Sequence, residues 1–286
     1  MIYQFMVDHE GEFGIVRMSR VLGVGRSGYY AWRSRPSGVR RQANEVLLAQ
    51  IHQEYRMSQE TYGSPRIHAA LQRKGVTCSR KRIARLMRVH GLAARKAHKR
   101  FPHTTARNPR ALPAPNLLNQ DFYAPAVDRK WVSDITYIDT AEGWLYLASV
   151  LDLFSRQVVG WAMDDHMETS LVEEALKMAM RRRTPAPGLL HHSDQGSQYT
   201  SEAYQQALAA YQCQVSMSRA GNCFDNAAME SFFSTLKTEC ASQPFATYAQ
   251  ARSAIFEYIE GWYNRQRLHS SLGYLSPLEF ELKSRH

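Results

Sequence analysis

The order of strand-like and helix-like segments in the second half of the chain constrains the fold more than any other feature. Three runs rich in β-branched and aromatic residues come first, at 130–139, 144–151 and 155–163. The turns between them are short, which predicts an antiparallel meander. Two short strand patterns follow, at 189–191 and 214–217. Helical patterns alternate with them, at about 169–183, 201–211, 225–240 and 247–263. This order predicts an α/β sheet with helices on both faces.

The distribution of charge divides the chain into two parts with different partners. Residues 1–120 contain 22 Lys and Arg against 6 Asp and Glu, whereas residues 121–286 contain 14 against 20. Between residues 61 and 110 there are 14 basic residues and no acidic one. Because such a segment repels itself until a polyanion neutralises it, we expect nucleic-acid binding here rather than a merely solvated basic face or a membrane-surface site.

Composition excludes several classes of protein. A chain with 44% hydrophobic residues can bury a sizeable core, which excludes wholesale disorder. No apolar run reaches the ~18 residues of a membrane span, and the start of the chain lacks the pattern of a signal peptide. The four cysteines lie far apart and form no C-x-x-C pair, which predicts free thiols in a reducing compartment. We therefore expect a cytoplasmic protein.

The first 60 residues are predicted to be helical, with a helix-turn-helix outline. Apolar residues at helical spacing from Ile15 precede the turn Gly23-Val24-Gly25, and a second short pattern runs to Trp32. The same glycines, with Gly28, also match the G-x-G-x-x-G fingerprint of dinucleotide-binding proteins. That fingerprint requires a preceding buried strand, whereas the pattern before Gly23 is helical, so helix-turn-helix is the favoured interpretation.

A second basic helix-turn-helix-like unit is predicted at 61–100, followed by a Pro-rich basic linker at 101–125. Ser64 and Pro65 read as the cap and first residue of one helix, and Ser79 as the cap of the next, which ends at Gly91. This second helix carries a basic face on which we expect DNA binding, formed by Arg80, Lys81, Arg82, Arg85 and Arg88. The sequence leaves open whether this face reads the major groove or touches only phosphates.

Three acidic residues stand where they contribute little to a fold. Asp134 lies in the middle of a strand, Asp194 directly follows another strand, and Glu230 lies in the first turns of a helix. Each has an ordinary structural interpretation, as a water-facing, turn or exposed helix residue. Bringing such carboxylates within about 4 Å costs roughly 4 kcal/mol per pair at an effective dielectric near 20. Divalent cations remove that cost, and oxygen ligands favour Mg²⁺ or Mn²⁺.

Five longer segments resemble the transposases of bacterial insertion elements, specifically the second-frame product of the insertion-sequence-3-type family. They are WVSDITYI, YLASVLDLFSRQVVGW, HHSDQGSQYTS, SMSRAGNCFDNAAMESFFSTLKTE and YIEGWYNRQRLHSSLGYLSP. In this DDE superfamily, which includes retroviral integrases, 35 residues separate the second acid from the third, as between Asp194 and Glu230. The family carries a Lys or Arg seven residues after the Glu, where this chain has Lys237.

The resemblance implies a ribonuclease-H-like integrase core over 126–286. An all-α, helix-turn-helix-type amino-terminal region precedes this core in the sequence. The resemblance also implies DNA transposition by 3′-end cleavage and strand transfer, with Asp134, Asp194 and Glu230 as catalytic residues and ligands of two Mg²⁺ (or Mn²⁺) ions. Lys237 would hold a DNA phosphate, because seven residues bring it to the same helix face as Glu230. Arg219 and Asn222, in the loop before that helix, are further candidate DNA contacts.

The implied partners are double-stranded DNA (terminal inverted repeats and target DNA) and further copies of the chain, at least a dimer on DNA. The first-frame protein is a possible fusion or partner, and the implied location is the bacterial nucleoid. Two other functions stay open, a ribonuclease-H-type nuclease and a non-catalytic DNA-binding regulator. Four further polar residues are predicted to have structural roles. Asp152 shapes a turn, His192 packs at a strand end, and Asp225 and Asn226 cap the helix of Glu230.

Overall fold

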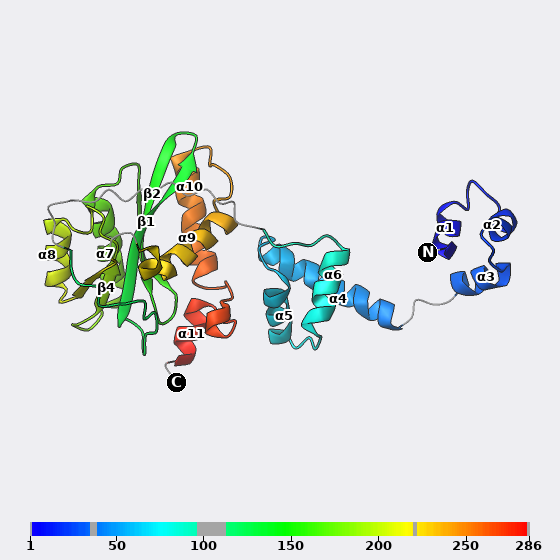
Figure 1. Cartoon of the computed structure of the whole chain (residues 1–286), viewed down its shortest axis with the longest axis horizontal. Helices are drawn as coiled ribbons and strands as arrows, with labels where there is room; N and C mark the ends of the chain where they lie inside the picture. Colours follow the sequence, from blue (N-terminus) through cyan, green and yellow to red (C-terminus); the bar gives the residue numbers. More distant parts are fainter. Residues whose placement is uncertain (1, 35–38, 96–112, 220–221, 285–286) are drawn as a thin grey trace.

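A computed structural model describes residues 2–34, 39–95, 113–219 and 222–284 of the chain (Figure 1). The first part of the predicted linker, residues 101–112, lies outside these ranges. Within them, no helix combines the length and the apolar character that a membrane crossing requires.

A five-stranded mixed sheet forms the centre of the second half of the chain. Its strands are β1 (Lys130–Thr140), β2 (Gly143–Asp152), β3 (Val158–Asp164), β4 (Leu190–Ser193) and β5 (Gln214–Met217). The spatial order is β3-β2-β1-β4-β5, with β1 to β3 antiparallel and β4 and β5 parallel to β1. The antiparallel meander is therefore confirmed. β3 begins three residues later than predicted because Asp152 closes a turn, accepting hydrogen bonds from Ser155 N at 2.9 Å and Asp128 N at 2.8 Å.

Helices cover both faces of this sheet, as predicted (Figure 1). Helices α7 (Thr169–Arg183) and α8 (Glu202–Ala210) pack on one face, and α9 (Ala227–Glu239) and α10 (Tyr248–Phe256) on the other. The alternation of strand side chains supplies both cores, with Trp131 facing α7 and Val132 facing α9. Gly160 of β3 allows α7 its close approach, since a Cβ there would lie 2.2 Å from the carbonyl oxygen of Ala175.

Several helix ends differ from the prediction. Gly63 occupies the N-cap position expected for Ser64, and Ser64 instead begins α5. Its hydroxyl is not needed as a cap because Gly63 already has the extended backbone of a cap. The predicted helix at 247–263 consists of α10 followed by a π-helical segment η2 (Glu257–Tyr263). Three elements were not predicted, namely η1 (Cys223–Asn226), η3 (Ser270–Leu272) and α11 (Pro277–Ser284).

The amino-terminal helices α1 (Ile2–Asp8), α2 (Ile15–Val21) and α3 (Arg26–Ser34) enclose a small core of Met6, Met18 and Tyr29. Gly23, with φ of +66°, forms the turn between α2 and α3, as the predicted helix-turn-helix outline requires. Because a helix precedes Gly23, the glycine pattern does not follow the strand that a dinucleotide fingerprint needs.

The next three helices, α4 (Val39–Met57), α5 (Ser64–Arg73) and α6 (Arg80–Val89), share one core. Leu47 and Ile51 of α4 pack there with Ile67 of α5 and Ile83 of α6. The predicted division at residue 60 is therefore wrong in one respect, since α4 packs with the helices that follow it. Ser79 caps α6 as predicted, accepting a hydrogen bond from Arg82 N at 3.3 Å.

Candidate active site

The sheet register brings Asp134 and Asp194 to neighbouring positions on β1 and β4. Val132 pairs with His192 in parallel orientation, and each aspartate follows two residues later. Neighbouring strands lie ~4.8 Å apart, so the two side chains leave the sheet side by side. Local backbone bonds orient both carboxylates: Asp134 Oδ1 accepts from Ile135 N at 2.8 Å, and Asp194 Oδ1 accepts from Gly196 N at 2.9 Å.

Helix α9 brings Glu230 to the part of β1 that carries Asp134. The side-chain amide of Asn226 donates to the carbonyl oxygen of Ser133 at 3.3 Å, which anchors the start of α9 beside Asp134. Glu230 lies in the first turn of α9, with an exposed side chain. Asn226 thus occupies the predicted N-cap position, but its side chain bonds to β1 and caps no α9 amide.

The three carboxylates interact electrostatically. Burial raises the pKa of Asp134 well above its ordinary value, the charges of Asp194 and Glu230 raise it further, and Lys237 opposes them. Burial also raises the pKa of Glu230. Lys237 Nζ lies 4.0 Å from the ring centre of Tyr137, a contact that the sequence did not predict. Burial lowers the pKa of Lys237, while Asp134 favours its charged form. Asp194, Glu230 and Lys237 therefore all influence the charge of Asp134.

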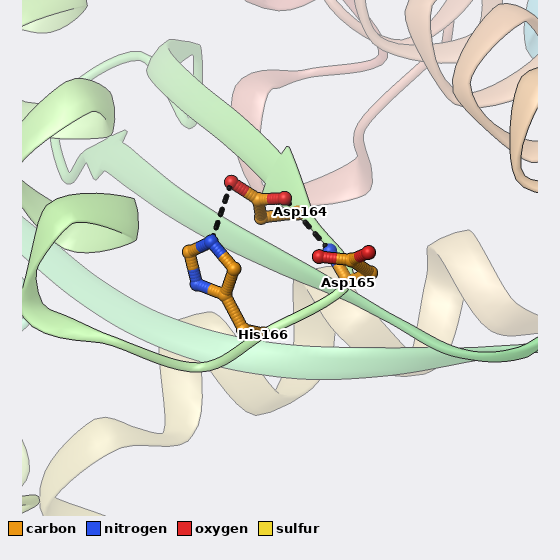
Figure 2. A group of neighbouring side chains, drawn as sticks. All are labelled: Asp164, Asp165 and His166. Carbon is orange, nitrogen blue, oxygen red and sulfur yellow. Dashed lines mark hydrogen bonds and ion pairs between the residues drawn. The ribbon is translucent and has the colours of Figure 1, made fainter.

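The predicted carboxylates do not all have oxygen atoms within 4.8 Å of one another. Among the described residues, the acidic group that meets this spacing is Asp164, Asp165 and His166, at the end of β3 (Figure 2). The carboxylate of Asp164 already has partners, because it lies 3.2 Å from His166 and 3.7 Å from Arg252. The side chains are exposed or half-exposed, so ordinary surface ion pairing accounts for this group.

A buried carboxylate, Asp225, organises the loop before α9. It accepts hydrogen bonds from Arg219 Nη2 at 2.9 Å, Gln120 Nε2 at 3.0 Å and Asn116 Nδ2 at 2.9 Å. Arg219 holds the pKa of this carboxyl well below its usual range. Asp225 therefore does not cap α9 as predicted, because its oxygens are taken by this loop. Asn222 also bonds to Asp225 and caps η1, so both predicted DNA contacts of the loop have an additional structural role.

Residues 114–121, which we call the strap, form hydrogen bonds both to β5 and to Asp225 in this loop. Pro115 O accepts from Met217 N at 3.4 Å, and the hydroxyl of Ser216 accepts from Leu117 N at 2.9 Å. The strap thus lies alongside β5 and supplies Asn116 and Gln120 to Asp225. It joins the start of the core to the loop that leads into the Glu230 helix.

His192 is fully buried at the end of β4, as its predicted packing role requires. Its Nδ1 lies 2.8 Å from the hydroxyl of Ser216 and its Nε2 3.0 Å from that of Ser218. Because both ring nitrogens have serine partners, the side chain has no nitrogen directed at a ligand. Asp152 likewise has the predicted turn role.

The burial of the neighbouring His191 should make the stability of the fold depend on pH. His191 is fully buried against Ser133, Tyr204 and His192, and burial lowers its pKa to about 3. Between that pKa and the unfolded value of about 6.5, the unfolded chain binds more protons, so stability falls as the pH drops below about 6.5. His191→Gln should remove up to ~1.4 kcal/mol per pH unit of this dependence, measured by denaturant unfolding from pH 7 to 5. The exposed His166→Gln is the matched control, and equal slopes for both variants would contradict the assignment.

On α6, four of the five predicted DNA-binding side chains are exposed, namely Arg80, Lys81, Arg85 and Arg88. Arg82 is half-buried and donates from Nε to Asn44 Oδ1 of α4 at 2.8 Å. Arg82 therefore links α6 to α4, and the other four remain available to a partner.

Comparison with known proteins separates an amino-terminal domain from a carboxy-terminal one. Models described as "Integrase core domain" match residues 124–223 and 211–277, and one described as "HTH-like domain" matches residues 41–100. A protein of Shigella sonnei, "Insertion element IS600 uncharacterized 31 kDa protein", is 44% identical over 93% of this chain and 98% of its own length. "Transposase InsF for insertion sequence IS3A" of Escherichia coli (strain K12) is 42% identical over 99% of both chains.

Among solved structures, a simian T-cell lymphotropic virus intasome aligns with a TM-score of 0.47 and 17% identity, covering 74% of this chain and 69% of the viral one. The family matches and the mixed sheet with helices on both faces confirm the ribonuclease-H-like integrase core behind a helix-turn-helix-like domain. The predicted resemblance is confirmed as well, since the identity to transposases extends over nearly the whole chain. The chain belongs to the family of transposases encoded by IS3-type bacterial insertion sequences, and its function is DNA transposition.

Proposed function

We propose that this transposase cleaves the 3′ ends of its element and joins them to DNA at a site formed by Asp134, Asp194 and Glu230, with two divalent ions. The observation that carries the proposal is the parallel register of β1 and β4, which sets Asp134 beside Asp194, together with the bond from Asn226 to Ser133 that anchors the start of α9 there. Residues far apart in sequence are thus brought to one part of β1, which supports a shared metal site.

The residues fit Mg²⁺ or Mn²⁺. Asp134 is partly buried beside two other acids, so full ionisation is unfavourable until cations neutralise it. The donors are carboxylate oxygens, which these hard cations prefer, and His192 offers no nitrogen because its ring bonds to two serines. Two such ions, when bound, lower the pKa of a water or 3′-hydroxyl and stabilise the departing oxygen of a phosphodiester.

Each protein group then has a distinct task. Asp134 and Asp194 present their carboxylates from the rigid sheet, and Glu230 adds a third from α9. Lys237 lies on the same side of α9 and interacts with Asp134, and its contact with Tyr137 holds the ammonium group at the site. We assign Lys237 to a DNA phosphate. Phosphate contacts by the exposed basic residues of α6, and by Arg219 and Asn222, belong to the same proposal.

The partners follow from the reaction. The substrates are duplex terminal inverted repeats and target DNA. Because two element ends must be joined in one complex, we propose at least a dimer on DNA, with the first-frame protein as fusion or partner.

A strand-transfer assay tests this proposal. The full chain is incubated with Mg²⁺, a labelled duplex carrying a recessed 3′ inverted-repeat end, and a target plasmid. We expect labelled repeat joined to plasmid, and no product when the metal is chelated. Cleavage without joining would identify a nuclease of the ribonuclease H type, and binding without either reaction would identify a regulator. Both outcomes contradict the proposal.

A further inference from the structure

A polar cleft lies where the helix-turn-helix-like domain meets the catalytic core. Its volume is about 540 Å³. One wall comes from the start of α5, with Arg66, and from the segment after α6, with Arg95. The other wall comes from α9, with Ser234 and Thr235. Ser234 comes four residues after Glu230 and therefore lies on the same side of α9. The cleft thus extends along the helix that carries the proposed catalytic glutamate.

The seam beside this cleft is tightly joined. Leu268 of the core is buried among the side chains of α4, α5 and α6. Its N–H donates to the hydroxyl of Tyr62 at 2.7 Å, and its carbonyl oxygen accepts from Arg66 Nε at 2.9 Å. Arg73 forms an ion pair with Glu279 across the same seam. Because bonds connect the two domains on both sides of Leu268, the cleft has defined walls.

The cationic groups in the cleft differ in how they are neutralised. Arg267 is buried and makes bidentate hydrogen bonds to Glu239, at 2.8 to 3.1 Å. Arg66 is half-buried, and its recorded partners within the described ranges are the Leu268 carbonyl and the face of Tyr62, with no carboxylate. Burial and the nearby Arg267 lower the pKa of Arg66, and the carboxylate of Glu239, which also lines the cleft but is hydrogen-bonded to Arg267, opposes them. Arg95 adds an exposed cation at the rim.

We propose that this cleft binds a backbone phosphate of the element DNA, with Arg66 and Arg95 as its cationic ligands and the hydroxyls of Ser234, Thr235 and Ser270 as donors. Guanidinium groups and hydroxyls are the usual protein contacts of DNA phosphates. A phosphate would supply an anionic hydrogen-bond partner, which the recorded contacts of Arg66 do not include. This inference rests on the proposed function, because the strand that reaches Glu230 along α9 is the one that would pass the cleft.

Arg66 could instead serve only to join the two domains, and Arg73 provides the control for that role. Both arginines lie on α5 and bond across the seam, but Arg73 is neutralised by Glu279. Arg66→Gln removes one cross-domain bond and Arg73→Gln removes at least as many, whereas only the first removes from the cleft a cation with no hydrogen-bonded carboxylate.

The test measures binding of the full chain to a duplex inverted repeat by fluorescence anisotropy, with chelator and at several NaCl concentrations. Arg66→Gln should weaken binding about threefold to tenfold and reduce the slope of log K against log [salt] by ~0.9, the value for one lost phosphate contact. Arg95→Gln should lower the slope in the same way, and Arg66→Lys should largely preserve it. Arg73→Gln should leave the slope unchanged.

Equal salt slopes for wild type, Arg66→Gln and Arg95→Gln would overturn the proposal. A cleft that binds only free phosphate would give this result, because neither arginine would then contact DNA. If Arg66→Gln fails to fold, the exposed Arg95→Gln decides the question alone. The assay contains no metal and requires no chemistry, so a wild-type chain inactive in strand transfer would contradict the proposed function without affecting this result.

Discussion

Replacing Asp134, Asp194 or Glu230 by the matching amide should reduce strand transfer by at least about a thousandfold, equivalent to ~4 kcal/mol of transition-state stabilisation. Each amide keeps the size of the side chain and removes one negative charge. Because two cations would depend on three carboxylates, the loss of any one weakens both metal binding and the stabilisation of the departing oxygen. The measurement is the rate of joining of a labelled repeat to plasmid in Mg²⁺.

DNA binding by these variants should be unchanged or slightly stronger, since an acid facing phosphates has been neutralised. Asp164→Asn, in the exposed acidic group at the end of β3, is the matched control and should retain strand transfer. Retention of joining by any of the three amide variants would show that its residue is not part of the site. Loss of joining in Asp164→Asn would mean that the active site lies at the end of β3.

Asp225→Asn should lower strand transfer about tenfold to a hundredfold, the range typical when a residue supporting metal ligands is lost. Asp225 lies in η1, directly before α9. It fixes the loop before α9 through Arg219, Gln120 and Asn116, and α9 carries Glu230. An amide cannot accept all of these bonds, and it leaves Arg219 without its carboxylate. The position of Glu230 relative to Asp134 should then become less well defined.

The Mg²⁺ concentration that gives half-maximal strand transfer distinguishes positioning from loss of stability. It should rise in Asp225→Asn, because a displaced Glu230 binds metal less well. Asp152→Asn removes an equally buried carboxylate that closes the turn before β3. That control should lower the melting temperature without changing the Mg²⁺ requirement. An unchanged Mg²⁺ requirement in Asp225→Asn would restrict Asp225 to a stabilising role.

The main elements of the core could be predicted because their signals are local. The β1 pattern was expected at 130–139 and occurs at Lys130–Thr140, and α7 was expected at about 169–183 and occurs at Thr169–Arg183. The sequence also contains a capping box for α11, in which Ser276 and Glu279 bond to each other's backbone amides, although no helix is predicted there. The π-helical form of η2 has no comparable pattern in the sequence.

The supporting residues of the site could not be predicted in the same way, because their partners are remote along the chain. Asn116 meets Asp225 across 109 residues, and Tyr137 meets Lys237 across the α9–β1 packing. Parallel pairing of β1 with β4 determines the proximity of Asp134 and Asp194, and no local pattern specifies that register. The roles of the three acids came from a resemblance, and the sheet supplies the physical reason for their proximity.

The strap has a consequence for work with isolated fragments. β5 is the outermost strand on its side of the sheet, and residues 114–121 cover its free flank. The integrase core match begins at residue 124, after the strap. A fragment cut at that boundary would leave an uncovered strand edge, which is a template for intermolecular pairing and aggregation. A catalytic fragment intended to remain monodisperse should therefore begin before Ala114.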